Sequence, residues 1–427
     1  MGSRMENRDI AALKEKLNSQ DKSERMTAIE TVKGLALEKG KNSGMTNNHV
    51  HSTYSFSPYT PARIVYEAYQ NHLDVVGLMD HDSIGGAEEF IEAGKAFGIA
   101  TTIGFEIRTD WLDTPFKDRR LNNPDQIGCA YFCVHGVPHQ KVGQAAMFLK
   151  GIVSARNERN RRMTERINAQ VPDIHLSFEE DVVPISMLND GGSITERHIL
   201  FALVNKLFEI CGKGEPLIEY LSKKLGLFLS ESQRTLLLDI DYAYYAYDVL
   251  NVLKGNFVAK IFIPAEPPET PTIQEAVMFC KEIGAILSYA YLGDVTASPT
   301  GDKKAQVFED AYLDELFAYL EVLGIPAVAY MPSRNTREQV QRIMALSDKH
   351  GFFQISGEDI NQPRQSFICE QLMYPEFSHL VESAWALIGH ERRASENLDD
   401  GMFSDRQNGR DLKEKTSEYA AFGRESV

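Results

Sequence analysis

Short apolar runs that alternate with helix-like stretches are the feature that most limits what this chain can fold into. The runs cover residues 75–79, 99–103, 131–134, 285–287, 327–329 and 352–355. Amphipathic stretches, among them 61–71, 86–97, 307–322 and 336–349, lie between them. Alternation of this kind builds a parallel sheet with helices outside it, either open or closed into a barrel. The chain is therefore predicted to be an α/β protein.

The segments outside this alternation define the expected domain organisation. Residues 1–44 are predicted to form a helical extension of two short amphipathic helices, the second starting with a capping box made by Asp21 and Glu24. Residues 45–390 hold the alternating pattern, interrupted at about 200–270 by a Leu- and Tyr-rich stretch that we interpret as a helical insertion. The polar segment 391–427 is expected to be a frayed tail.

Composition limits the compartment and the partners. The five cysteines are odd in number and widely scattered, which favours reduced, mostly buried thiols and a cytoplasmic protein. The N-terminus lacks the apolar stretch of a signal peptide, and no apolar run approaches the ~20 residues that span a bilayer. A net charge of −16 argues against extended nucleic-acid binding, because phosphate contacts need a basic surface. The net charge does not exclude a small phosphorylated substrate bound in a local pocket.

Candidate metal ligands follow the apolar runs. They are Asp80-His81-Asp82 after 75–79, Glu106 after 99–103, His135 after 131–134 and Asp359 after 352–355, with His49-Val-His51 ahead of them all. In a closed parallel barrel the carboxyl ends of the strands meet at one mouth, so these side chains would converge there. Imidazoles and carboxylates together suit Zn, Mn or Fe. A carboxylate such as Glu106 can bridge two ions about 3.5–4 Å apart.

Each of these signals has a plainer interpretation by itself. An H-x-H arises often by chance, the acids around His81 could form a turn and a helix cap, and Glu106 could pair with Arg108. His135 could be a hydrogen-bonded core histidine. The five arginines of segment 145–168 favour a solvated basic face, with phosphate contact as the alternative.

Taken in order, these strings resemble the motifs of the PHP (polymerase and histidinol phosphatase) family of metal-dependent phosphoesterases. The matching strings are His49-Val-His-Ser-Thr-Tyr-Ser55, Leu78-Met-Asp-His-Asp82, Ile103-Gly-Phe-Glu106, Val134-His135-Gly136, Arg197-His198-Ile199, Tyr330-Met-Pro-Ser333 and Ser356-Gly-Glu-Asp359. The resemblance extends over about 46–365. It implies a distorted seven-stranded (β/α) barrel with a helical insertion, and it implies metal-dependent hydrolysis of phosphoesters.

The resemblance also implies which ligands this chain keeps. The family's first metal site is intact, with His49, His51, Glu106 and Asp359. The second keeps Glu106 and His135 but has Tyr289 where the family has a histidine. The third keeps only His81, since Phe56 replaces an acid and Asn361 replaces the closing histidine. One or two ions are therefore expected rather than three.

Two further residues receive roles from the same resemblance. His198 is expected to contact the leaving group or a phosphate oxygen. Asp80 is expected to orient a ligand histidine without binding the metal ion itself.

Three functions remain open at this stage. The first is hydrolysis of phosphomonoesters or nucleotide phosphodiesters with one or two metal ions. The second is a catalytically impaired PHP-like protein that keeps the barrel for ligand binding or scaffolding, which the clustered ligand losses favour. The third is an amidohydrolase-type barrel, which also opens with H-x-H but usually needs a bridging lysine after a strand. No lysine directly follows any of the six runs.

Overall fold

The computed structural model describes residues 12–35, 37, 43–295 and 306–427. Its centre is a sheet whose seven strands lie side by side in the order of the sequence. The strands are β1 (Thr46–Val50), β2 (Val75–His81), β3 (Ala100–Asp110), β4 (Cys129–His135), β5 (Ile286–Ala290), β6 (Ala327–Tyr330) and β7 (Phe353–Ser356). Beyond β7 the chain returns to β1: Ile360 donates its N–H to the carbonyl of His49 (3.1 Å) and accepts from the N–H of His51 (2.8 Å). The predicted seven-stranded barrel is confirmed.

Strand β4 departs from the expected parallel arrangement. It pairs antiparallel with both β3 and β5, whereas the other neighbouring strands pair parallel. The connection 111–128 contains no helix to carry the chain back across the sheet, and an antiparallel pair needs none. The expectation that every strand ends at the same mouth is therefore wrong for β4, whose carboxyl end points to the opposite end of the barrel.

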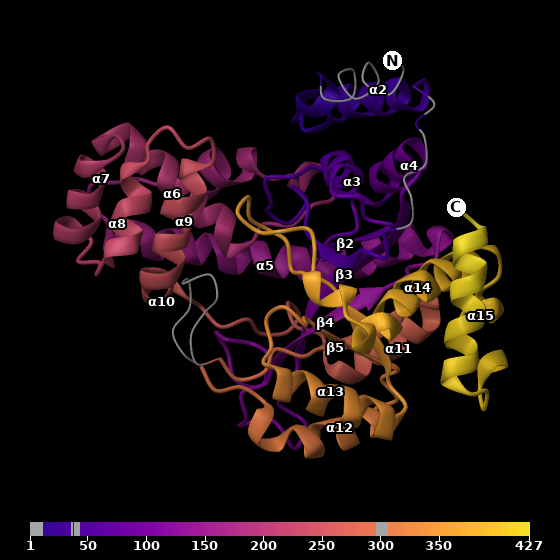
Figure 1. Cartoon of the computed structure of the whole chain (residues 1–427). Helices are drawn as coiled ribbons and strands as arrows, with labels where there is room; N and C mark the ends of the chain where they lie inside the picture. The colour runs from indigo at the N-terminus through magenta and orange to yellow at the C-terminus, as the bar shows by residue number, and fades with distance from the viewer. Residues whose placement is uncertain (1–11, 36, 38–42, 296–305) are drawn as a thin grey trace.

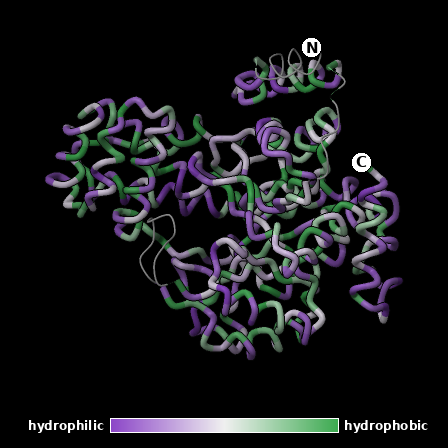
Figure 2. The backbone as a smooth tube through the Cα atoms, viewed as in Figure 1, coloured by the Kyte–Doolittle hydropathy of each residue, from purple (hydrophilic) through white to green (hydrophobic). Residues whose placement is uncertain are grey.

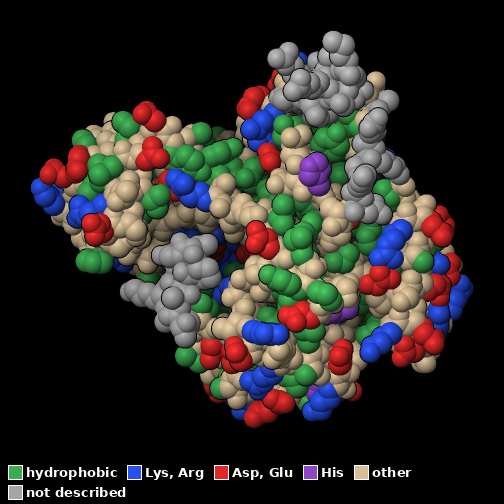
Figure 3. Space-filling view, in the orientation of Figure 1, with side chains coloured by type: hydrophobic (Ala, Val, Ile, Leu, Met, Phe, Trp, Pro, Cys, Tyr) green, Lys and Arg blue, Asp and Glu red, His purple; other side chains and the backbone are tan. Residues whose placement is uncertain are grey.

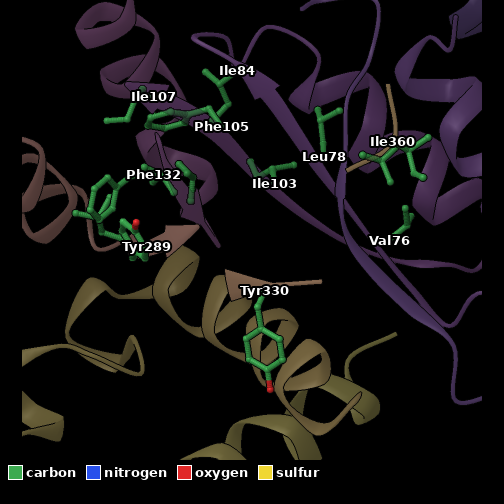
Figure 4. Close-up of a cluster of buried hydrophobic side chains, with 14 of the residues drawn as sticks. Val76, Leu78, Ile84, Ile103, Phe105, Ile107, Phe132, Tyr289, Tyr330 and Ile360 are labelled. Carbon is green, nitrogen blue, oxygen red and sulfur yellow. The ribbon is translucent and has the colours of Figure 1, made fainter. Parts of the chain in front are cut away.

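Helices pack around the outside of the barrel (Figure 1). They are α3 (Pro61–Gln70), α4 (Ala87–Phe97), α11 (Ile273–Ile283), α12 (Leu313–Val322) and α13 (Arg337–His350). Thr60, Thr272 and Thr336 cap α3, α11 and α13, because each side chain accepts the N–H of the third helical residue. The apolar layer between strands and helices forms the main core, part of which is drawn in Figure 4.

Alternation along β3 shows how the barrel separates its two faces. Ile103, Phe105 and Ile107 point outward into the main core. With a period of two, Glu106 points inward between Phe105 and Ile107. The same alternation on every strand leaves the barrel interior for polar residues near the mouth.

A helical lobe stands at one side of the barrel (Figure 1). It contains the end of the long α5 (Val142–Gln170), followed by α6 (Glu196–Cys211), α7 (Glu215–Glu219), α8 (Glu231–Leu238), α9 (Tyr245–Asn256) and α10 (Val258–Ile261). Its own apolar core runs from Met163 to Ile261, so the lobe begins earlier in the chain than the insertion expected at about 200–270. Apolar and polar residues alternate along its helices (Figure 2), as amphipathic packing requires.

The N-terminal extension is tied to the barrel. Residues 12–17 are helical, and the rest of the first expected helix lies outside the described residues. Helix α2 (Lys22–Lys33) begins after Asp21, whose side chain accepts the N–H of Ser23, so Asp21 is the N-cap as predicted. The N–H of Asp21 donates to the Ser19 hydroxyl (3.1 Å) instead of the Glu24 side chain, so the capping box is not formed. The buried Arg25 of α2 forms an ion pair with the buried Glu89 of α4.

The C-terminal segment is folded, and the expected frayed tail is wrong. Helix α14 (Ser378–Glu396) covers the end of the barrel, and α15 (Leu412–Glu425) packs against it with Tyr419 fully buried. Gly389 and Gly423 allow this close approach, since a Cβ at either would lie within 2.2 Å of a backbone oxygen of the facing helix. The segment looked polar because its few apolar residues are spaced for one narrow interface. Among the described residues, no helix combines the length and apolar character that a membrane crossing requires.

Candidate metal centre

Two histidines at the end of β1 begin the site. An H-x-H on an extended segment places both side chains on one face, and here both point into the barrel. The two Nε2 atoms lie 3.2 Å apart. With a carboxylate oxygen of Glu106 from β3 they form a group of donor atoms within 4.8 Å of one another.

Two more predicted ligands join this group. Asp359, which follows β7, places Oδ1 3.0 Å from Nε2 of His51. His81, at the end of β2, places Nδ1 2.6 Å from Oε2 of Glu106. Asn361 also reaches the site, where its Nδ2 donates to Oδ1 of Asp359 (2.8 Å).

Burial prepares the imidazoles for a metal ion. Burial lowers the pKa of His49, and burial together with the nearby Arg156 lowers the pKa of His81 to about 3. Both rings are therefore neutral at neutral pH, which leaves a nitrogen lone pair available to a cation. Burial also raises the pKa of Glu106, so an ion next to this carboxylate would stabilise its charged form.

The residues fit a divalent ion. With metal–nitrogen bonds of about 2.1 Å, two ligands of a tetrahedral ion lie about 3.4 Å apart. The observed 3.2 Å between the Nε2 atoms of His49 and His51 is close to that spacing. Nitrogen and oxygen donors together suit a transition-metal ion rather than Mg or Ca.

Asp80 supports the site from behind. Its carboxylate accepts from the N–H of Ser52 (2.7 Å), from the Ser52 hydroxyl (2.6 Å) and from the Ser55 hydroxyl (2.7 Å). The Oγ atom of Ser55 lies 3.4 Å from Nδ1 of His51. Asp80 thus holds the loop that orients His51, which is consistent with the role expected of it.

His135 lies deeper in the barrel than the other predicted ligands. Because β4 is antiparallel, His135 pairs with Ile286, whereas Cys133 is the residue opposite Glu106. His135 lines the same cavity, and neither of its ring nitrogens has a hydrogen-bond partner among the described residues. Burial and the nearby His49 lower its pKa to about 3.

Cys133 is the neighbour of the site that sequence reasoning missed. Its Sγ lies 3.7 Å from Nδ1 of His49. Period two along β4 puts Cys133 on the same face as His135, which was a usable signal. The signal was overlooked because only the last residue of the strand was expected to reach the site.

Tyr289 turns away from the site. Its ring packs against Phe132 on the outside of the barrel, with the centroids 5.5 Å apart, and its side chain is fully buried in the main core. The inward-facing neighbour on β5 is Ser288, which pairs with Cys133. Tyr289 therefore cannot take the place of the family's histidine ligand, because its side chain would first have to move to the inner face of β5.

Phe56 occupies the position of the missing acid and belongs to another core. Its backbone has φ 88°, which is uncommon for a bulky residue. Its ring contacts Phe201 and Tyr247 of the helical lobe and the ring of His198 (4.9 Å between centroids). A phenyl ring here joins barrel to lobe and offers no metal ligand.

His198 is placed as a helix cap. Its Nδ1 accepts the N–H of Thr195 (3.0 Å) at the start of α6, behind residues 195–197 that line the cavity. The expected contact between His198 and a leaving group stays a prediction.

Ion pairs lie between the metal centre and the helical lobe, and their side chains are buried except for Glu196, which is 24% exposed. Arg156 pairs with Asp82 (2.5 Å) and with Glu196 (3.0 Å), and Arg159 pairs with Glu196 (2.8 Å) and with Glu269 (2.8 Å). Arg108 of β3 also pairs with Glu269. Burial opposes ionisation of Glu196, yet the arginines hold its pKa well below the usual range.

This arrangement corrects one expectation about α5. Its basic stretch is not wholly solvated, because Arg156 and Arg159 are only 3% and 1% exposed.

A cavity of about 400 Å³ opens above the ligands, between the barrel mouth and the helical lobe. Its floor includes His49, His81 and Glu106. Basic side chains on its wall are Arg156, Arg197 and Lys254, and an apolar side is formed by Val258, Ala259 and Phe262 around α10.

The fold and site define a barrel protein with a histidine–carboxylate group that could hold a metal ion, and one family model matches part of the chain. Residues 47–178 match the family model of the PHP domain. The resemblance to the PHP family is therefore confirmed over this segment.

Similar proteins agree with this match over limited lengths. A stretch of 63 residues is 41% identical to part of a 5'-3' exoribonuclease of Haemophilus influenzae, covering 15% of this chain and 23% of that protein. A stretch of 61 residues is 43% identical to part of an error-prone DNA polymerase of Nocardia farcinica, covering 14% of this chain and 5% of the polymerase. The matches thus span less than a quarter of either relative.

One solved structure is similar over most of its length. It is a protein of Bifidobacterium adolescentis described as a metal-dependent phosphoesterase, with a TM-score of 0.50 and 18% identity. The likeness covers 77% of this chain and 93% of that one, and it supports the barrel fold.

Proposed function

We propose that this protein is a metal-dependent hydrolase of phosphoesters, either phosphomonoesters or nucleotide phosphodiesters. The observation that carries the proposal is the compact group formed by His49, His51 and Glu106, with Asp359 beside it, on the floor of a cavity with basic side chains in its wall. Such a site places metal ligands and phosphate-attracting charges around one enclosed space.

The proposed cofactor is one or two ions of Zn, Mn or Fe. His49, His51, Glu106 and Asp359 would hold the first ion. When bound, such an ion polarises phosphoryl oxygens and lowers the pKa of a coordinated water. The mixture of imidazole and carboxylate ligands supports a transition metal.

The surrounding residues would bind and orient the substrate. Arg197 and Lys254 bring positive charge to the cavity wall, which favours an anionic group there, whereas the charge of Arg156 is already balanced by Asp82 and Glu196. The apolar residues around α10 can cover the uncharged part of a small substrate and limit the access of water. Asp80 keeps His51 oriented through the Ser55 hydroxyl.

The proposed partner is a small phosphorylated compound or a nucleotide. The proposed location of the protein is the cytoplasm. Acidic and basic side chains are interspersed over the face seen in Figure 3, without a continuous basic patch. With a net charge of −16, we do not expect binding to extended nucleic acid or to a membrane. The five cysteines are free thiols, which supports a reducing compartment.

The test measures metal content and hydrolysis on the same samples. Protein purified without chelator is expected to carry one or two ions and to hydrolyse generic phosphomonoester or phosphodiester substrates. His49→Ala and Glu106→Gln should lose both properties. His72→Asn is the matched control, because His72 lies outside the site with φ 57°, which asparagine tolerates.

Other outcomes would decide against catalysis. Bound metal without turnover on any phosphoester would favour the impaired, ligand-binding alternative, which the outward Tyr289 and the apolar Phe56 support. Neither metal nor turnover after reconstitution with Mn or Zn would refute the metal centre itself.

A further inference from the structure

The inner face of β4 carries donor atoms that the four-residue site leaves unused. Tyr131 and His135 both line the cavity, and Cys133 lies between them on the same face. In the antiparallel pairing Cys133 stands directly opposite Glu106. Cross-strand neighbours of this kind have Cβ atoms about 4.5–5.5 Å apart, so the thiol and the carboxylate can reach a common ion.

The thiol also approaches the first group of ligands. The Sγ atom lies 3.7 Å from Nδ1 of His49, on the side of the ring away from His51. Cys133 is fully buried, so this sulfur faces the interior of the barrel and not solvent.

His135 gives an independent sign that something binds here. Its side chain is 2% exposed, it lines the cavity, and both ring nitrogens lack a hydrogen-bond partner among the described residues. Buried polar groups in folded proteins are almost always paired, so an imidazole with two unpaired nitrogens indicates a missing partner. A cation that accepts one nitrogen lone pair would supply it.

The neighbouring strand offers no competing ligand. On β5 the residue opposite Cys133 is Ser288, whose hydroxyl donates to the Cys133 carbonyl (3.3 Å), and Tyr289 points outward. His81 approaches Glu106 from β2, on the opposite side of β3 from β4. A second ion on the β4 side of Glu106 would therefore take its remaining protein ligands from β4.

We propose that Cys133 is a thiolate ligand of a second metal ion, held together with Glu106 and His135 below the His49–His51 position. The proposal rests on the proposed metal centre, with Glu106 bridging two ions about 3.5–4 Å apart. Cys133 and His135 lie outside the compact group of donors, so the ion must draw their side chains toward Glu106. A sulfur ligand makes this position selective for Zn, Fe(II) or Co(II) over Mg or Mn.

Cobalt distinguishes this proposal from the metal centre on which it rests. Metal-free protein is titrated anaerobically with Co(II) and followed by absorption. Visible bands report any bound cobalt, and a near-ultraviolet thiolate-to-cobalt charge-transfer band reports a sulfur ligand. We expect the charge-transfer band to grow with the second equivalent and to be absent from Cys133→Ser.

Two variants control the assignment. Cys129→Ser removes the other buried thiol of β4, four residues away on the same face, and should keep the band. Cys133→His should keep two bound ions and lose only the band, which separates loss of sulfur from loss of folding.

The remaining outcomes contradict the proposal in distinguishable ways. Bound cobalt without a charge-transfer band would show that Cys133 is a neighbour of His49 and not a metal ligand. The site formed by His49, His51, Glu106 and Asp359 would then still be supported. A band that persists in Cys133→Ser would refute the assignment to this residue. No bound cobalt at all would refute the metal centre and the proposed function with it.

Discussion

Replacing Arg25 with methionine is expected to release the N-terminal helix from the barrel. Nε and Nη2 of Arg25 donate to the two carboxylate oxygens of Glu89, at 2.8 and 2.7 Å. Nη1 donates to the carbonyls of Ser19 (2.9 Å) and Gln20 (3.1 Å). Glu89 also accepts the N–H of Ala62 (3.1 Å), so one carboxylate joins α2 to the start of α3.

The size of the effect follows from burial. Both side chains of the pair have zero exposure, and removing one partner of a buried pair costs about 3–5 kcal/mol because the other charge stays buried. The Lys33–Glu92 pair is the matched control, since it joins the same two helices at 2.9 Å with about a third of each side chain exposed. Lys33→Met should cost about 0–1 kcal/mol.

Hydrogen exchange of the α2 amides measures the difference directly. Since about 1.4 kcal/mol is a factor of ten, Arg25→Met should speed exchange by about a hundred- to several-thousand-fold, up to the limit of free exchange. Lys33→Met should change it less than about fivefold. The double variant Arg25→Met with Glu89→Leu should recover much of the protection. Equal exchange in Arg25→Met and Lys33→Met would refute the reasoning.

Three further predictions concern the barrel. Burial raises the pKa of Glu309 from 4.5 to about 7, so the folded state keeps a proton that the unfolded chain releases, and stability falls as pH rises through this window. In Glu309→Gln, the decrease in the free energy of unfolding between pH 5 and pH 8 should be about 3 kcal/mol smaller, as measured by denaturant unfolding at the two pH values. An unchanged pH dependence of stability would show that Glu309 is not the group responsible. Ser288→His should add bound metal per chain whereas Tyr289→His should not; the opposite result would mean that β5 presents its other face. Phe56→Ala should cost about 3–5 kcal/mol in unfolding experiments and leave the metal content unchanged, and a loss of metal would place Phe56 in the site.

Local pattern was enough to predict the barrel and the centre of its site. The spacing of apolar residues indicates the alternation of strands and helices. The H-x-H pattern places His49 and His51 on one face of an extended segment wherever that segment lies in the fold. Glu106 and Asp359 could be predicted because each follows an apolar run in a parallel strand. Such strands share one mouth whatever the details of packing.

The tertiary structure decided what depends on pairing between distant segments. The direction of β4 is set by its two neighbours, and it decided that Cys133 rather than His135 faces Glu106. A shift of one position along a strand moves a side chain to the other face, so Tyr289, which occupies the position of a family ligand in the sequence, is a core residue in the fold. The burial of Arg156 likewise needed acidic partners from just after β2 and from α6, which no local window contains. Periodicity within one element is a local property, whereas register, strand direction and charge pairing arise only when elements meet.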